Sequence, residues 1–274
     1  MLIRSMMMIL SLQWSFTAFS AVPSAEKELK MDNPSVYFVG HSLFSFLDEL
    51  AFLADKAGMP LDKNLQYIGG SSLQNNWQNP HLSRDGNNAR EDLKTGNYNI
   101  LILTERVLPL IKSYEEFDSS VYAAKYTELA AKGNPEVQPY LYETWHGFWV
   151  NKWYKKIFSP DWRGRLDKDL ILWNKIVEEV NAKNVSQKKM KLIRVGQGMG
   201  KIHDDIAAGS APKLTSIRQL FSDEIHLNNW GNYFVACVHF ATIYGKSPEG
   251  LPTLGDIPAE TAAYFQKIAW QIAG

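Results

Sequence analysis

The sequence of 274 residues predicts an α/β fold, a three-layer α/β/α sandwich built around a five-stranded parallel sheet. Two observations support this prediction. Short runs rich in β-branched and aromatic residues alternate with longer segments of helical periodicity. Several short runs are almost continuously apolar, as in parallel strands that helices cover on both faces. The alternation of strand and helix therefore favours a doubly wound sheet.

The elements follow one another in a regular order. The first strand candidate, Ser35–Val39, is apolar and stops at Gly40. The other strand candidates are Asn64–Ile68, Tyr98–Leu103, Gln138–Glu143 and Lys191–Val195. Helical patterns occupy Phe44–Ala57, Ser113–Ala131, Leu166–Ala182, Asn229–Tyr244 and Ala259–Ile272. Because no linker or repeat interrupts the chain after its start, we expect a single domain over residues 26–274.

The first 25 residues have the pattern of a signal peptide. Arg4 supplies a positive charge, and the largely apolar stretch Met6–Phe19 follows. Cleavage is expected after Ala18-Phe19-Ser20, with Ala21 or Ala25 as alternatives. The apolar stretch is short and interrupted by polar residues, so it does not predict a stable membrane span. We expect a secreted or periplasmic protein; an uncleaved segment would instead anchor it to the membrane.

The overall charge excludes some classes of partner. Lys+Arg and Asp+Glu both number 29, so net charge gives no support to nucleic-acid binding. No spacing of His, Cys, Asp or Glu predicts a metal site, and no glycine-rich nucleotide motif predicts a cofactor. The single cysteine, Cys237, lies in an apolar helical run and predicts a buried, unreactive thiol.

Two short motifs at opposite ends of the chain carry chemistry. Gly40-His41-Ser42-Leu43 lies where the first strand gives way to a helical pattern, at the edge where open α/β sheets bind ligands. Asp223-Glu224-Ile225-His226 places an acid three residues before a histidine. Together they provide a nucleophile (Ser42), a general base (His226) and an acid that orients the base (Asp223).

The order Ser…Asp-x-x-His resembles the SGNH (GDSL-like) hydrolase superfamily. The resemblance implies a flavodoxin-like sheet and a serine esterase that forms an acyl-enzyme. It also implies an oxyanion hole built from the backbone N–H groups of Ser42 and of a glycine, for which Gly70 is the candidate and Gly69 its neighbour. His41, which is often aspartate in the superfamily, is expected to support the turn.

The third donor of the superfamily's oxyanion hole does not map onto this chain. Where a Gly-x-Asn block is expected, the sequence is Leu101-Ile-Leu-Thr-Glu105-Arg106, and an ionised glutamate cannot donate a hydrogen bond. Glu105 is either protonated or has another role. Thr104, Arg106, Asn75, Asn76 or a residue from another loop is then the missing donor. We expect Glu105 to point away from the oxyanion or to be paired there.

The segment from Tyr142 to Trp162 is unusually rich in tryptophan, which predicts a lid or a binding wall. Glu143, Trp145 and His146, with Glu105, are candidate substrate-binding residues, although Glu143 could equally hold His146 or lie in solvent. These aromatic rings could stack on sugars or, equally, pack in the core and lid. From the first alternative we expect the substrate to be an O-acetyl ester on a carbohydrate, either small or polymeric. A short-chain lipid or aryl esterase is the alternative, as is a non-catalytic carbohydrate-binding or polysaccharide-assembly protein on the same fold.

Overall fold

The computed structural model describes residues 33–107, 110–148, 161–184 and 188–273. Five strands form one parallel sheet in the order β2-β1-β3-β4-β5. They are β1 (Ser35–Gly40), β2 (Asp62–Tyr67), β3 (Ile100–Leu103), β4 (Gln138–Tyr142) and β5 (Lys191–Ile193). This is the flavodoxin-like strand order, and it confirms the predicted fold class.

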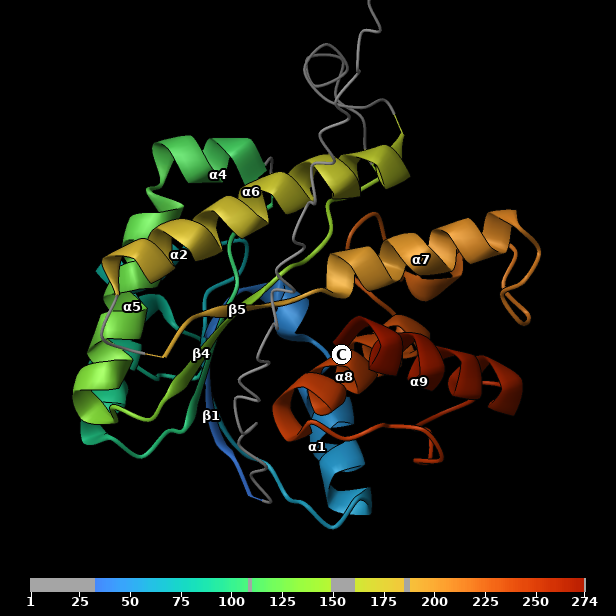
Figure 1. The fold of residues 1–274 in the computed structure, drawn as a ribbon, viewed down its shortest axis with the longest axis horizontal. Helices are drawn as coiled ribbons and strands as arrows, with labels where there is room; N and C mark the ends of the chain where they lie inside the picture. The colour runs from blue at the N-terminus through green and yellow to red at the C-terminus, as the bar shows by residue number, and fades with distance from the viewer. Residues whose placement is uncertain (1–32, 108–109, 149–160, 185–187, 274) are drawn as a thin grey trace, which may run out of the picture.

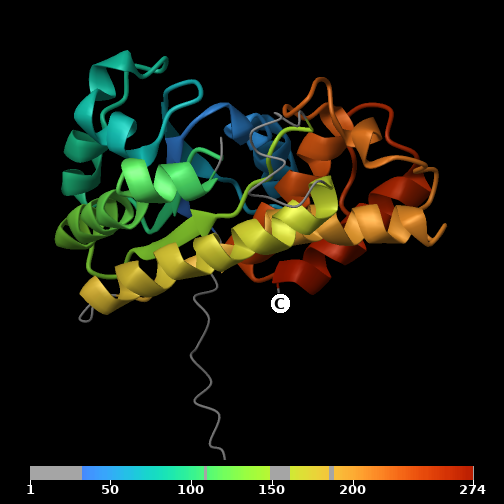
Figure 2. The same cartoon turned by 90° about the horizontal axis from the view of Figure 1, so that it is seen from above.

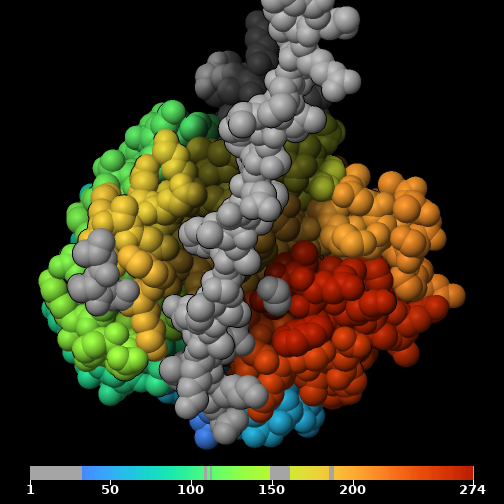
Figure 3. All heavy atoms as spheres, viewed as in Figure 1, coloured from blue at the N-terminus to red at the C-terminus, as the bar shows by residue number. Residues whose placement is uncertain are grey.

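Helices cover both faces of the sheet (Figures 1 and 2). One side holds α1 (Leu47–Lys56), α7 (Val195–Ala207), α8 (Asn229–Tyr244) and α9 (Ala259–Ala273). The other holds α2 (Leu73–Gln78), α4 (Leu110–Glu116), α5 (Ser119–Gly133) and α6 (Trp162–Lys183). The short α3 (Ala89–Asp92) and single-turn 3₁₀ helices, η1 (Ser42–Phe44), η2 (Pro80–Leu82), η3 (Leu93–Thr95) and η5 (Ile217–Leu220), complete the described elements. Figure 3 shows α6 on one side of the molecular face and α7 and α9 on the other.

Burial explains the apolar runs of the sequence. The central strands β1 and β3 are buried along almost their whole length, and the apolar helix α8 is buried nearly all round. The buried apolar residues form one continuous core. The outer strands carry exposed charges, Asp62 and Lys63 on β2 and Lys191 on β5.

Several helices differ from the sequence prediction, and the short helices α2 and α3 were not predicted. The expected helix Ser113–Ala131 is divided into α4 and α5, because Asp118 takes a left-handed backbone conformation with φ of 49°. Helix α7 was not predicted.

The expected signal peptide lies outside the described residues. Within the described part of the chain, none of the helices has the length and hydropathy needed to cross a membrane.

The topology brings four loops to one edge of the sheet. The chain leads from β1 to β2 on one side and then from β2 to β3 on the other side of β1, and a crevice forms at the carboxyl ends of strands at such a switch point. Ser42 follows β1, Gly70 follows β2 and Glu105 follows β3. The loop that contains Asp223 and His226 precedes α8 and reaches the same edge.

Candidate active site

Ser42 begins a tight turn directly after β1. A side chain at Gly40 would bring its Cβ within 2.5 Å of the Thr104 Cγ2 atom, so only glycine fits where the strand ends. His41 caps the following 3₁₀ turn, with its Nδ1 accepting a hydrogen bond from the Leu43 N–H at 3.4 Å. The backbone on both sides of the Ser42 hydroxyl is therefore held in place.

His41 links this turn to the end of β3. Its Nε2 donates to the Glu105 carbonyl oxygen at 3.1 Å, while Nδ1 acts as the acceptor described above. Burial lowers the pKa of His41 to about 4, so the imidazole is neutral near pH 7. With both nitrogens engaged, His41 supports the turn, as the sequence suggested, and has no free nitrogen with which to act as a base.

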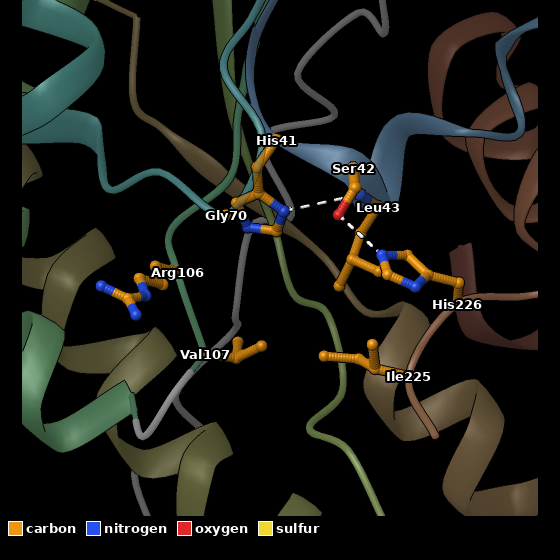
Figure 4. Close-up of a pocket in the computed structure, with 8 residues that line it drawn as sticks. All are labelled: His41, Ser42, Leu43, Gly70, Arg106, Val107, Ile225 and His226. Carbon is orange, nitrogen blue, oxygen red and sulfur yellow. Dashed lines mark hydrogen bonds between the residues drawn. The ribbon is translucent and has the colours of Figure 1, made fainter. Parts of the chain in front are cut away.

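Ser42, His226 and Asp223 form a continuous chain of hydrogen bonds. The Ser42 Oγ lies 3.0 Å from His226 Nε2 (Figure 4), and His226 Nδ1 lies 2.7 Å from Asp223 Oδ2. With Nδ1 protonated, His226 donates to Asp223 and accepts the hydroxyl hydrogen of Ser42. These distances lie within the range that proton transfer from a nucleophile to its base requires.

Asp223 is fixed by its own loop. Its Oδ1 accepts the backbone N–H groups of Ile225 and His226, each at 2.7 Å, which leaves Oδ2 for the imidazole. Partial desolvation raises the pKa of Asp223, but the hydrogen bonds from Ile225 and His226 outweigh it and lower that pKa to about 2. The carboxylate therefore stays ionised at neutral pH and orients the imidazole.

The loop after β4 holds the Asp223–His226 loop in place through two hydrogen bonds. The indole Nε1 of Trp145 donates to the Ile225 carbonyl at 2.8 Å, and the Phe148 N–H donates to the Glu224 carbonyl at 2.9 Å. Trp145 is 1% exposed and packs edge-on against Phe221. It was expected to bind substrate; the structure instead places it behind the loop, where it positions the peptide next to His226.

A cavity of about 200 Å³ opens beside the Ser42 hydroxyl. It is lined by His41, Ser42, Leu43, Gly70, Arg106, Val107, Ile225 and His226 (Figure 4). Gly70 has a positive φ of 61°, a conformation that suits glycine and lets backbone approach a ligand. The structure thus brings Gly70, Ser42 and His226 around one cavity, while Asp223 holds His226 from outside it.

The expected third oxyanion donor has no equivalent in this cavity. Within the described residues its lining includes no asparagine or glutamine. The Asn76 amide donates to the carbonyls of Gly40 and Ser72, the Asn75 amide donates to the Ser71 hydroxyl, and the Thr104 hydroxyl donates to a β4 carbonyl. Arg106, the other alternative, lines the cavity, but its guanidinium is directed away from Ser42 in Figure 4. The backbone N–H groups of Ser42 and Gly70 are the remaining candidates from the described chain.

Glu105 points away from the cavity, one of the two alternatives expected from its sequence position. Its carboxylate is fully buried and accepts the N–H of Leu73 at the start of α2, at 3.3 and 3.4 Å, and the N–H of Arg106 at 2.7 Å. Burial raises the pKa of Glu105 to about 7, so protonated and ionised forms are both populated near neutral pH. Glu105 caps a helix and does not line the cavity that was expected to bind substrate.

Glu143 has the same role one strand further along the sheet. It is 1% exposed and accepts the backbone N–H and the side-chain Nε2 of Gln197 in the first turn of α7, at 3.2 and 3.0 Å. Burial raises its pKa to about 7. His146 is buried as well, and its Nδ1 lies 3.1 Å from Asp169 Oδ2 on α6. The structure brings neither Glu143 nor His146 to the cavity.

Three cavity residues were not singled out from the sequence. Leu43, Val107 and Ile225 supply its apolar walls. Leu43 and Ile225 are the immediate neighbours of Ser42 and His226, and this adjacency was the available signal. Val107 gave none, because its loop has no recognisable motif. Within the described residues no group of three or more His, Cys, Asp or Glu side chains could hold a metal ion.

Comparison with known proteins gives a likeness in structure and none in sequence. No protein-family model matches the chain, and no curated protein matches it. Among solved structures, the chain is similar to a DUF4886 family protein from Bacteroides uniformis ATCC 8492, with a TM-score of 0.64 and 18% sequence identity. The match covers 87% of this chain and 94% of that one. At this identity the likeness shows the fold alone.

Proposed function

We propose that the protein is a serine ester hydrolase of the SGNH type that acts outside the cytoplasm, with O-acetyl esters on carbohydrates as its substrates. The observation that carries the proposal is the hydrogen-bonded chain from Ser42 through His226 to Asp223, placed beside a cavity at the carboxyl edge of the sheet. A serine that donates to an imidazole which a carboxylate orients is the arrangement that activates a hydroxyl for acyl transfer.

The reaction follows from these contacts. The Ser42 Oγ attacks the ester carbonyl while His226 Nε2 takes the hydroxyl proton, and the carbonyl oxygen becomes an oxyanion beside the N–H groups of Ser42 and Gly70. The C–O bond to the alcohol then breaks, and His226 returns the proton to the departing alcohol. Water attacks the acyl-enzyme in the same way, which releases the acid and restores Ser42. Asp223 stays ionised throughout and stabilises the imidazolium.

The alcohol part of the substrate rests on fewer observations than the acyl-transfer chemistry does. The expected export and the family resemblance favour a carbohydrate. The aromatic residues give less support to a sugar substrate, because Tyr142, Trp145 and Trp162 are at most 9% exposed and pack in the core. Residues 149–160, which hold the rest of that aromatic segment, lie outside the described residues. The apolar cavity walls favour the second candidate, a short-chain lipid or aryl ester.

A fluorophosphonate probe tests the proposal, because it reacts only with an activated serine. We expect the wild-type protein to be labelled on Ser42 and the Ser42→Ala variant to be unlabelled, with ester hydrolysis reduced by roughly 10³- to 10⁶-fold. Ser45→Ala is the matched control. Ser45 lies three residues after Ser42, and its hydroxyl donates a hydrogen bond to Asn232 and not to His226. Wild-type protein without labelling would favour a non-catalytic carbohydrate-binding role. Acetate released from acetylated polysaccharides then identifies the substrate.

A further inference from the structure

The cavity beside Ser42 has apolar walls. Leu43 and Val107 are 2% and 3% exposed, and Figure 4 shows the side chains of Val107 and Ile225 facing each other across the space. These residues come from three separate segments: the turn after β1, the loop after β3 and the loop before α8. Their convergence forms a defined apolar compartment that opens on the Ser42 hydroxyl.

The polar side chains next to Ser42 are already engaged, and Arg106 is the one polar side chain of the described lining whose buried Nε has no hydrogen-bond partner. Both nitrogens of His41 are hydrogen-bonded, and Ser42 and His226 bond to each other. Arg106 is directed away from Ser42 in Figure 4, and its guanidinium carbon lies 6.0 Å from the centre of the Phe117 ring. A ligand hydroxyl placed among the apolar walls would lose its hydrogen bonds to water without replacement. The compartment is therefore suited to a hydrocarbon group and unsuited to a sugar ring.

The size of the cavity limits that hydrocarbon group. Its volume of about 200 Å³ lies below the range of about 300–1,000 Å³ typical of sites for drug-sized ligands. It still equals roughly seven water molecules at about 30 Å³ each. A methylene group takes roughly the same volume as a water molecule, and the reacting carbonyl carbon and the two ester oxygens also lie in this cavity, because Ser42 and His226 line it. Room remains for about four chain carbons, so an acetyl methyl would leave most of that space empty and a chain a few carbons longer would fill it. Long acyl chains would meet the wall formed by Val107 and Ile225.

The exposure of the triad indicates which half of an ester lies in the cavity. The side chains of His226 and Asp223 are 43% and 54% exposed, so one side of the imidazole faces solvent. His226 must reach the oxygen of the departing alcohol, and a bulky alcohol has room only on this open side. The acyl group then extends the other way, into the apolar compartment.

We propose, on the basis of the serine ester hydrolase function above, that this compartment is the acyl site, that it takes short acyl groups from acetyl up to about butyryl, and that Val107 sets their maximum length. The backbone before Val107 is held from two sides. The Thr104 hydroxyl donates to the Tyr142 carbonyl, and the Glu105 carbonyl accepts from His41. Shortening the Val107 side chain should therefore lengthen the site without displacing the wall.

A series of para-nitrophenyl esters tests this assignment. For the wild-type protein we expect kcat/KM to rise from acetate to butyrate and to fall by about tenfold or more at octanoate, the scale on which methylene groups are discriminated in apolar pockets. Val107→Ala should raise the ratio of octanoate to acetate kcat/KM by about tenfold, and Val107→Leu should lower the butyrate value. Val121→Ala, at a valine of α5 that is 36% exposed and outside the cavity, should leave the ratio unchanged.

Labelling of Ser42 by the fluorophosphonate probe in each variant separates the two proposals. If Ser42 is labelled and Val107→Ala keeps the wild-type chain-length profile, with a circular dichroism spectrum and melting temperature like those of Val121→Ala, the acyl-site assignment is wrong and the hydrolase proposal stands. A wild-type protein that prefers octanoate to butyrate would overturn the assignment too. Absence of labelling in the wild-type protein would overturn the hydrolase proposal, and the acyl site with it.

Discussion

The buried carboxyl group of Glu105 makes a quantitative prediction about stability. It is fully buried at the start of α2, and burial raises its pKa from an ordinary value of 4.5 to about 7. Replacement by glutamine keeps the size of the side chain and one acceptor oxygen but removes the titration. Comparing Glu105→Gln with the wild-type protein therefore isolates the free energy of burying this charge.

The sign and size follow from proton linkage. Between pH 4.5 and about 7 the folded protein keeps a proton on Glu105 that the unfolded chain has released, so this group's contribution to stability falls as pH rises. One pKa unit corresponds to about 1.4 kcal/mol, so the loss across this window is about 3 kcal/mol. The glutamine variant does not lose it. His41, whose pKa is lowered to about 4, titrates in both proteins and cancels in the difference.

Urea denaturation followed by far-ultraviolet circular dichroism, at steps from pH 4.5 to about 8, measures the difference. The free energy of unfolding of Glu105→Gln minus that of the wild-type protein should rise by about 3 kcal/mol over the window and then stay level. A constant offset reports only altered hydrogen bonds to Leu73 and Arg106. Glu91→Gln, at an exposed glutamate paired with Lys94, controls for the loss of a surface charge. A difference that does not change with pH would refute the reasoning.

Two further predictions concern the residues that orient His226. Asp223→Asn should lower kcat by roughly 10²- to 10⁴-fold with little change in melting temperature, because the amide no longer fixes the imidazole tautomer; steady-state kinetics and thermal unfolding check this. Trp145→Phe keeps the ring against Phe221 but leaves the Ile225 carbonyl without its donor, at a cost of about 1–3 kcal/mol. We expect kcat and the rate of fluorophosphonate labelling to fall about tenfold or more with KM nearly unchanged; unaltered labelling would assign Trp145 to packing alone.

The sequence predicted where the strands end better than it predicted which partners the side chains at those ends contact. The apolar run before Gly40 and the three-residue spacing of Asp223 and His226 are local patterns, and the structure joins them into one hydrogen-bonded chain. Glu105 was correctly placed at a strand end. Its partner could not be foreseen, because α2 is only six residues long and has no clear periodicity.

Helix α7 shows why some elements escaped prediction. Its first half contains three glycines, which lower intrinsic helix propensity. Packing overrides propensity here: a Cβ on Gly198 would lie 2.7 Å from the Phe234 ring of α8, and one on Gly196 would lie 2.9 Å from the Glu143 carboxyl group. The glycines allow the helix to approach its neighbours closely. The close packing that requires these glycines involves Phe234 and Glu143, which are distant in sequence, so local sequence patterns could not predict it.

The outer strands of the sheet affect how the protein behaves at high concentration. A parallel sheet that is not closed into a barrel leaves unpaired peptide groups along two borders, and another chain could extend the sheet there. Here one border, β5, has only three residues and begins with the exposed Lys191, and the other, β2, begins with the charged pair Asp62 and Lys63. Adding a strand to either border would bury charge for few new peptide hydrogen bonds. The same features that end the sheet therefore oppose self-association through it.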